Sequence, residues 1–134
     1  MITNEQLTFC VQQLYPGTAN GQDYWIGHAV DANGNQRAPA AIFRWGRTDL
    51  RPPAPSEIGP LWAQYERAFN SMKADRAARN RREALLKAAD AAVGRAADAG
   101  MDPTPFRKYR QALRDITAQS GYPMSIDWPE EPTI

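Results

Sequence analysis

Apolar residues recur at helical spacing in the first segment of the chain. They are Leu7, Cys10, Val11 and Leu14. Steps of three and four residues place such side chains on one face of a helix. Thr3 and Gln6 have the spacing of a capping box, in which the hydroxyl accepts a hydrogen bond from an early helix amide. Pro16 and Gly17 end the segment, so the pattern predicts a helix over residues 3–15.

Two apolar and aromatic runs follow, DYWIGHAVD and APAAIFRWG, on either side of ANGNQR. Asn33-Gly34 lies between them and favours a type I′ hairpin turn, which needs positive φ at both central residues. We therefore predict antiparallel strands over residues 23–31 and 38–46. Pro39 cannot donate a ladder hydrogen bond, which places the second strand at a sheet edge.

A proline-rich stretch and a long helical pattern form the middle of the chain. Residues 47–55, RTDLRPPAP, are typical of an extended linker because consecutive prolines hold the backbone open. The apolar positions of the helical pattern are Leu61, Trp62, Tyr65, Phe69 and Met72, then, after a charged stretch, Leu85, Leu86, Ala89 and Val93. Because Ala and Arg are good helix formers, we predict one helix of about 35–40 residues. It begins near Ser56 or Pro60 and ends at Gly100.

The last third of the chain combines an arginine-rich amphipathic helix with a short tail that contains Trp and Pro. The apolar positions of the helix are Phe106, Tyr109, Leu113 and Ile116. The sequence DPTP supplies the preceding turn, so we predict a helix over residues 104–119 that folds back antiparallel on residues 82–99. Gly121 and Pro123 end this helix, and MSIDWPEEPTI is expected to continue as an extended tail.

These elements predict an α+β fold that is mainly α. We expect three parts: an N-terminal module of helix and β-hairpin over residues 1–52, a proline linker and long connecting helix over residues 53–81, and a C-terminal helical hairpin with an extended tail over residues 82–134. With 134 residues, the chain can bury only a modest hydrophobic core.

Composition narrows the class of protein. Hydrophobic residues make up 43% of the chain and charged residues 23%, as in ordinary soluble globular proteins. The formal net charge of +1 gives no support for binding to nucleic acid or to a membrane surface. No stretch approaches the roughly 20 apolar residues that span a bilayer. MITNEQLTF shows no basic leader followed by an apolar core, so we expect a protein that works in a cytoplasm.

Residues suited to catalysis or metal binding are few. Cys10 is the single cysteine and falls on the apolar face of the first helix, where we interpret it as core filler. His28 is the single histidine and has no Cys, Asp or Glu at metal-ligand spacing. No serine lies in a nucleophile-elbow context, and no nucleotide-binding fingerprint occurs. We therefore predict a protein with no enzyme activity, no cofactor and no metal.

A basic run from Arg76 to Arg82 is the best candidate for contact with nucleic acid. A helix could lay Arg76, Arg79 and Arg82 along a phosphate backbone. Asp75 and Glu83 dilute this charge, and no aromatic residue is interleaved. We interpret the run as the solvated middle of a bridging helix, with a partner interface and nucleic-acid binding as the alternatives.

Four tryptophans are many for a chain of this length: Trp25, Trp45, Trp62 and Trp128. A small hairpin and a terminal tail have little interior in which to hide an indole. Trp and Tyr also dominate interface energetics, because they bury large areas with little loss of rotamer entropy. We expect Trp62 in the core, and for Trp128 we keep two alternatives, packing on the helical hairpin or binding a partner.

The C-terminal region contains a specific pattern. An Arg-x-x-Leu-Leu-x-x-x-Asp segment precedes the run YRQALRD, and Tyr-Pro, Trp-Pro and a last proline follow it. These positions are Arg82, Leu85, Leu86 and Asp90, then Tyr109 to Ile116, then Tyr122-Pro123, Trp128-Pro129 and Pro132. The pattern resembles that of the bacteriophage tail fibre assembly proteins, a group of tail assembly chaperones. Phe106 stands where that family usually has a tryptophan.

The resemblance implies a non-enzymatic chaperone that binds a trimeric tail fibre in the host cytoplasm and in some phages stays in the virion tail. Fibre chains must associate in register before their strand edges pair wrongly, and a protein that covers those edges reduces the risk. The alternatives are a permanent structural or adaptor protein of the phage tail, baseplate or fibre, and a regulatory or nucleic-acid-binding protein.

Candidate partner-binding residues occur in both terminal modules. We expect the N-terminal hairpin to contact the tail fibre or baseplate protein. The C-terminal hairpin would serve as a stable base or as a self-association surface of a homo-oligomer. We expect neither nucleic acid nor a membrane as a partner. The candidate residues are Trp25, Ile42, Phe43, Trp45, Tyr109, Arg110 and Trp128.

Overall fold

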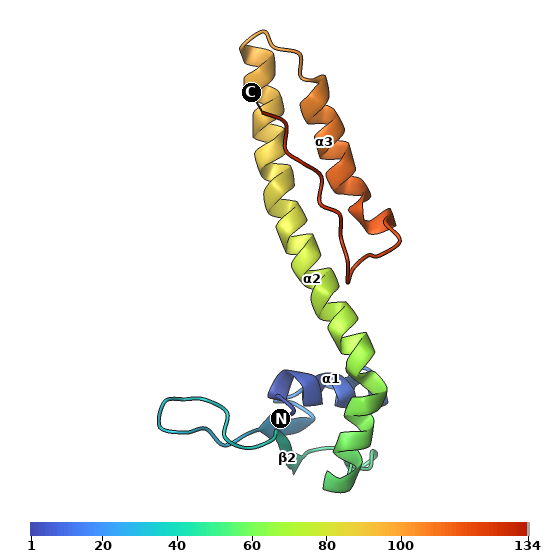
Figure 1. The fold of residues 1–134 in the computed structure, drawn as a ribbon. Coiled ribbons are helices and arrows are strands. Elements are labelled where there is room, and N and C mark those ends of the chain that lie inside the picture. The colour runs from blue at the N-terminus through green and yellow to red at the C-terminus, as the bar shows by residue number, and fades with distance from the viewer. Residues whose placement is uncertain (134) are drawn as a thin grey trace. The chain divides into compact units, whose positions relative to one another are not determined.

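The computed structural model describes residues 1–133 (Figure 1). The elements along the chain are α1 (Asn4–Leu14), β1 (Tyr24–Gly27), β2 (Ala41–Trp45), α2 (Pro55–Asp98), α3 (Thr104–Arg114) and the short 3-10 helix η1 (Asp115–Ala118). The predicted α+β fold that is mainly α is confirmed. The chain forms two compact units, unit 1 from Met1 to Phe69 and unit 2 from Asn70 to Ile134, and each is described by itself. The three-part division stays a prediction, because compactness alone does not tell which segments fold independently.

The first helix begins at the predicted capping box. The amide of Gln6 donates to the hydroxyl of Thr3 at 3.2 Å, and the amide of Thr3 donates to the side-chain oxygen of Gln6 at 3.0 Å. Two early amides that a helix cannot pair internally are thereby satisfied. The buried face of α1 consists of Leu7, Cys10 and Val11.

The two strands pair antiparallel but are shorter than predicted. Tyr24 lies opposite Trp45, and Gly27 lies opposite Ala41. Of the predicted strands, only the first half of 23–31 and the last part of 38–46 pair in the sheet, and nearer the turn one isolated bridge pairs Val30 with Gln36. The side-chain amide of Gln36 donates to the carbonyls of Ile2 and Ala38, which holds the connecting loop away from a regular ladder.

The predicted type I′ turn at Asn33-Gly34 is wrong. Gly34 has a positive φ of 82°, whereas no residue other than glycine has a positive φ among those described. The carboxylate of Asp31 explains the difference, because it accepts hydrogen bonds from the amides of Asn33 and Asn35 at 2.8 and 3.0 Å. An aspartate that bonds the backbone two residues on builds a wider turn, and only the glycine takes the left-handed conformation.

The long helix α2 is continuous over 44 residues, somewhat longer than predicted. Its first turn contains Pro55 and is held by Glu57, whose carboxylate accepts from the amide of Ala54 at 3.1 Å. The guanidinium of Arg51 binds the same carboxylate at 2.7 and 2.9 Å and, more than any other group, lowers the pKa of Glu57 to about 2. Pro60 thus lies inside the helix and does not open it.

The core of unit 1 lies between α1, the sheet and the first part of α2. Its buried residues are Leu7, Val11, Tyr24, Ile26 and Ala40, with Ile2, Tyr15, Ile42, Trp45 and Ile58 packed against them. At the end of the unit, the Phe69 ring makes edge contacts with Phe9 and Trp62, with each pair of ring centroids 5.5 Å apart. One small hydrophobic core therefore joins all the elements of unit 1.

Unit 2 is the predicted helical hairpin with its tail. α3 and the tail run beside the last part of α2 (Figure 1), where two clusters of buried side chains join them. The clusters are Ala89, Tyr109 and Leu113, with Trp128 packed against them, and Ala92, Ala96 and Phe106. Small alanine side chains on α2 let the aromatic rings of α3 approach closely, so the two helices pack together through a small hydrophobic core.

Candidate partner-binding surfaces

A β-bulge lies at Phe43 in β2. Ile26 lies opposite Ile42 and Trp25 lies opposite Arg44, so Phe43 is the extra residue of β2. A bulge of this kind breaks the two-residue alternation and re-aims a side chain. Ile42 and Trp45, three residues apart, therefore both pack on the core, whereas Phe43 between them is 69% exposed.

The outer face of the sheet carries aromatic rings and a guanidinium. A Cβ atom placed on Gly27 would lie 3.1 Å from Cε1 of Phe43, so the ring lies over a strand position that has no side chain. Beside it, the guanidinium of Arg44 lies over the ring of Trp25, 4.4 Å from its centroid. Trp25 is half-buried. This face therefore offers flat apolar area beside the positive charge of Arg44.

Trp45 packs on the core of unit 1, and its contacts there are structural. Its ring stacks on Tyr24 with centroids 5.4 Å apart, and its indole N–H donates to the carbonyl of Leu50 at 2.9 Å. Tyr15 makes an edge contact with the same ring at 6.0 Å. Trp45 thus ties the segment after β2 to the core.

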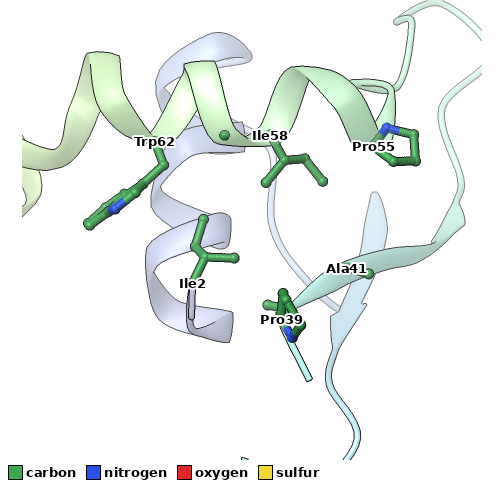
Figure 2. Close-up of a pocket in the computed structure, with 8 residues that line it drawn as sticks. Ile2, Pro39, Ala41, Pro55, Ile58 and Trp62 are labelled. Atoms are coloured by element: carbon green, nitrogen blue, oxygen red, sulfur yellow. The ribbon is translucent and has the colours of Figure 1, made fainter. Parts of the chain in front are cut away.

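An apolar hollow of about 490 Å³ opens between the start of β2 and the first turns of α2 (Figure 2). Figure 2 shows Ile58 and Trp62 of α2 on one side, and Pro39 and Ala41 on the other. The lining residues are Ile2, Pro39, Ala40, Ala41, Pro55, Ile58, Gly59 and Trp62. Trp62, which we expected in the core, is half-buried and forms part of this wall. The size is that of a small ligand pocket or of a site for one or two large side chains.

A second, shallower hollow of about 470 Å³ adjoins the same strand. It is lined by Gly27, His28, Ala29, Ala38, Pro39, Ala41 and Phe43. Its lining shares Pro39 and Ala41 with that of the first hollow. The Nδ1 atom of His28 is enclosed and has no hydrogen-bond partner among residues 1–133.

In unit 2, the candidate residues Tyr109 and Arg110 lie at the contact between the two helices. Tyr109 is only 6% exposed and belongs to the core. Arg110 is half-buried and donates to the carboxylate of Asp90 on α2 at 3.0 Å. Asp90 and Arg110 both belong to the pattern that resembles the assembly family, and here they form an ion pair across the hairpin.

Trp128 and Met124 shape a third hollow of about 310 Å³, in unit 2. The guanidinium of Arg81 covers the ring of Trp128. Met124 is 66% exposed and Ile126 is half-buried. The hollow is lined by Ala74, Ala77, Ala78, Arg81, Pro123, Met124, Ile126 and Trp128.

Several lining residues were not among the candidates from the sequence. Ile2, Pro39, Ala41 and Ile58 come from three distant segments, and none is aromatic. Only Pro39, as the mark of an edge strand, gave a local signal of an open strand position. The binding role of the candidates from the sequence stays a prediction.

The side chains suited to catalysis or metal binding do not form a cluster among the described residues. Cys10 is fully buried, and burial raises the pKa of its thiol, so it packs as a hydrophobic side chain. Within the described residues, no group of three or more His, Cys, Asp and Glu side chains is placed to hold a metal ion. Likewise, none of the helices over residues 1–133 is long and apolar enough to cross a membrane.

In the comparison with protein families, a different family model matches each of the two units. Residues 75–133 match the family model described as phage tail assembly chaperone protein, and residues 7–70 match the model described as XkdW protein. The break between the two matches falls close to the boundary between unit 1 and unit 2, at Phe69 and Asn70. Comparison with the curated proteins and with the solved structures gave no match.

Together the two matches support a phage tail assembly protein family, and the match of residues 75–133 confirms the resemblance of the C-terminal region. The chaperone family is one of phage assembly proteins and is not a known enzyme family. A role in phage tail assembly, through protein partners of the tail, is therefore supported for this chain.

Proposed function

We propose that this chain is a tail fibre assembly chaperone that works by binding alone, in the host cytoplasm. The match of residues 75–133 supports the class, and the exposed apolar surface of unit 1 supports the mode of action. That surface combines the 69% exposed ring of Phe43 with the hollow beside Ala41 and Trp62. Exposed apolar patches of this kind mark protein interaction sites.

Binding energy is the means by which such a protein assists assembly. Fibre chains that have not yet associated expose strand edges and apolar faces, which aggregate unless something covers them. A protein with apolar hollows covers such surfaces and releases them when the correct subunit arrives. Its benefit therefore depends on its concentration relative to the fibre chains.

Co-expression tests the proposal. The adjacent fibre gene is expressed with and without this chain, and the soluble trimeric fibre is measured by size-exclusion chromatography with light scattering. We expect more soluble trimer with the chain present. Equal solubility and an equal oligomeric state in both cultures would contradict a chaperone function.

A permanent adaptor of the tail is a second candidate. The observation in its favour is that each unit has a hollow of its own, an apolar one beside Trp62 and a mixed one, lined in part by Arg81, beside Trp128, as expected of a protein that holds two partners. Mass spectrometry of purified phage particles separates the two functions. Stoichiometric amounts of the chain in the virion support the adaptor, and its absence from the particle supports a transient chaperone.

A further inference from the structure

We propose that unit 1 recognises an extended, uncharged segment of its partner, which pairs as an additional strand with the outer edge of β2. The segment lies in the groove between β2 and the first two turns of α2. This inference rests on the proposed function, because it names the part of a tail protein that the chaperone takes. Strand addition at a free sheet edge combines main-chain hydrogen bonds with side-chain pockets.

The N-terminal segment of the chain already forms a hydrogen bond with the residue that precedes β2 on this edge. The amide of Ala40 donates to the carbonyl of Ile2 at 3.0 Å, so the backbone of the N-terminal segment lies against the residue just before β2. Alternate residues of an antiparallel strand turn their backbone groups to the same side. Ile42 is therefore the next residue whose amide and carbonyl face away from β1. The sheet over residues 1–133 has two strands, β1 and β2, and no further strand reaches Ile42.

The groove has the geometry of a strand-binding site. Pro39 and Ala41 form the wall on the strand side, and Ile58 and Trp62 form the wall on the helix side (Figure 2). A segment paired with Ile42 runs between these walls. Side chains of a strand alternate between its faces, so every second one points into the 490 Å³ hollow.

The second hollow accepts the intervening side chains. Because the two hollows share Pro39 and Ala41 in their linings, one extended segment can reach both. Where the bound segment passes the two hollows, its side chains on both faces should be apolar, as in strands that are buried on both sides. The enclosed Nδ1 of His28 has no partner among the described residues, and a hydrogen-bonding group of the bound segment would satisfy it.

Charge disfavours the β2 edge of a second copy of this chain as the occupant. In the part of the chain that the structure describes, neither hollow is lined by Asp, Glu, Lys or Arg. If the β2 edge of another copy entered the groove, it would bring Arg44 next to Ile42 and Phe43. A guanidinium held in an apolar groove without a counter-charge is unfavourable. An uncharged segment of a tail protein meets no such penalty.

The test uses the full chain and synthetic peptides of about 10 residues, the upper length of an ordinary strand, tiled across the tail proteins encoded beside this gene. We expect an apolar, strand-forming peptide to bind, as measured by fluorescence titration. Single N-methylation along that peptide should weaken binding about tenfold or more at alternate positions only, because alternate amides pair with the edge. Hydrogen exchange of the Ile42 amide should slow about tenfold or more in the complex.

Variants of the chain supply the controls. Ala41→Arg places a charge where the two hollows meet and should weaken peptide binding about tenfold or more. Met124→Arg changes an exposed methionine of unit 2 and should leave peptide binding unchanged. Because the N-methyl scan needs no change to the protein, it stays decisive if Ala41→Arg fails to fold.

Three results would overturn the inference: no peptide binds, N-methylation has no alternating effect, or exchange of the Ile42 amide is unchanged in the complex. A homodimer that Ala41→Arg dissociates would assign the edge to a second copy and also contradict it. The proposed function fails separately, when co-expression does not raise soluble fibre. If Ala41→Arg preserves that effect in full, the chaperone function stands and this binding site is wrong.

Discussion

The guanidinium of Arg81 lies over the indole of Trp128, with its Cζ atom 4.3 Å from the ring centroid. Trp128 also packs against the cluster of Ala89, Tyr109 and Leu113. Of the two alternatives for this tryptophan, the structure thus shows packing on the helical hairpin. The tail is further held by Gln119, whose side chain exchanges two hydrogen bonds of 2.8 Å with the backbone of Asp127.

Trp128→Ala should release the tail without unfolding unit 2. Because the ring is half-buried and its cation–π contact is partly exposed, we expect the free energy of unfolding to fall by about 1–2 kcal/mol. Urea unfolding measures this value, and faster exchange of the Asp127 amide reports release of the tail. Arg81→Ala is the matched control and should have the smaller effect. A loss equal to that of Leu113→Ala would make Trp128 a core residue.

Leu113→Ala should be among the most destabilising single changes in unit 2. Leu113 is fully buried against Ala89 and Tyr109, so the change removes buried apolar area and leaves a cavity. We expect a loss of about 2–5 kcal/mol in urea unfolding. Leu14→Ala, at a site that is 37% exposed, should cost about 1 kcal/mol or less. Equal effects of the two changes would contradict the packing of the hairpin.

Gly94 and Gly100 should respond in opposite ways to alanine. A Cβ atom on Gly94 would meet nothing within 4 Å, and the residue lies inside α2. Gly94→Ala should therefore raise the free energy of unfolding by about 0.5–1 kcal/mol. Gly100 has φ of 70°, so Gly100→Ala should lower it by about 1–2 kcal/mol. Thermal unfolding of both variants checks this, and the same sign for both would contradict the helix end.

The hydrogen bond from the hydroxyl of Tyr122 to the carboxylate of Asp75 should make stability depend on pH at both extremes. This bond, followed by that from Arg79, lowers the pKa of Asp75, and Asp75 in turn raises the pKa of Tyr122. A lowered carboxyl pKa contributes stability above its unfolded value of about 3.9, and this is lost as pH falls through the folded pKa. A raised phenol pKa contributes stability below about 10, and this is lost as pH rises through the folded pKa.

Tyr122→Phe should therefore be less stable than the native chain at neutral pH. We expect the difference to shrink below about pH 4 and above about pH 10. Urea unfolding across pH measures it, with Tyr65→Phe as the control at another half-buried tyrosine. A difference that stays constant over the whole range would show that the hydrogen bond does not couple to these titrations.

Local signals explain why most of the fold could be predicted from the sequence. The Thr3 and Gln6 cap, the apolar stripe of α3 and the glycine at position 100 each act within one or two helical turns. The structure departs from the predictions where a side chain forms a hydrogen bond with the backbone of another residue. Asp31 reshapes the turn around Gly34, and the bond from the Ala54 amide to Glu57 starts α2 at Pro55, which favours the predicted start near Ser56 over that at Pro60.

The candidate site was harder to predict because it depends on tertiary structure. Strict alternation from Ile42 would place Trp45 on the outer face with Phe43, but the bulge at Phe43 returns Trp45 to the core side. No residue type marks that bulge in the sequence. The hollow likewise requires Ile2, Pro39 and Ile58 to meet, which only the fold determines.

Refolding of the tail fibre in vitro tests most directly the claim that this chain assists assembly through binding alone. Denatured fibre is diluted into buffer with increasing amounts of the purified full chain, with and without ATP, and the yield of trimer is measured by light scattering. We predict that the yield rises with the amount of chain until it saturates, and that ATP has no effect. A yield that is independent of the chain, or that rises only with ATP, would contradict the account.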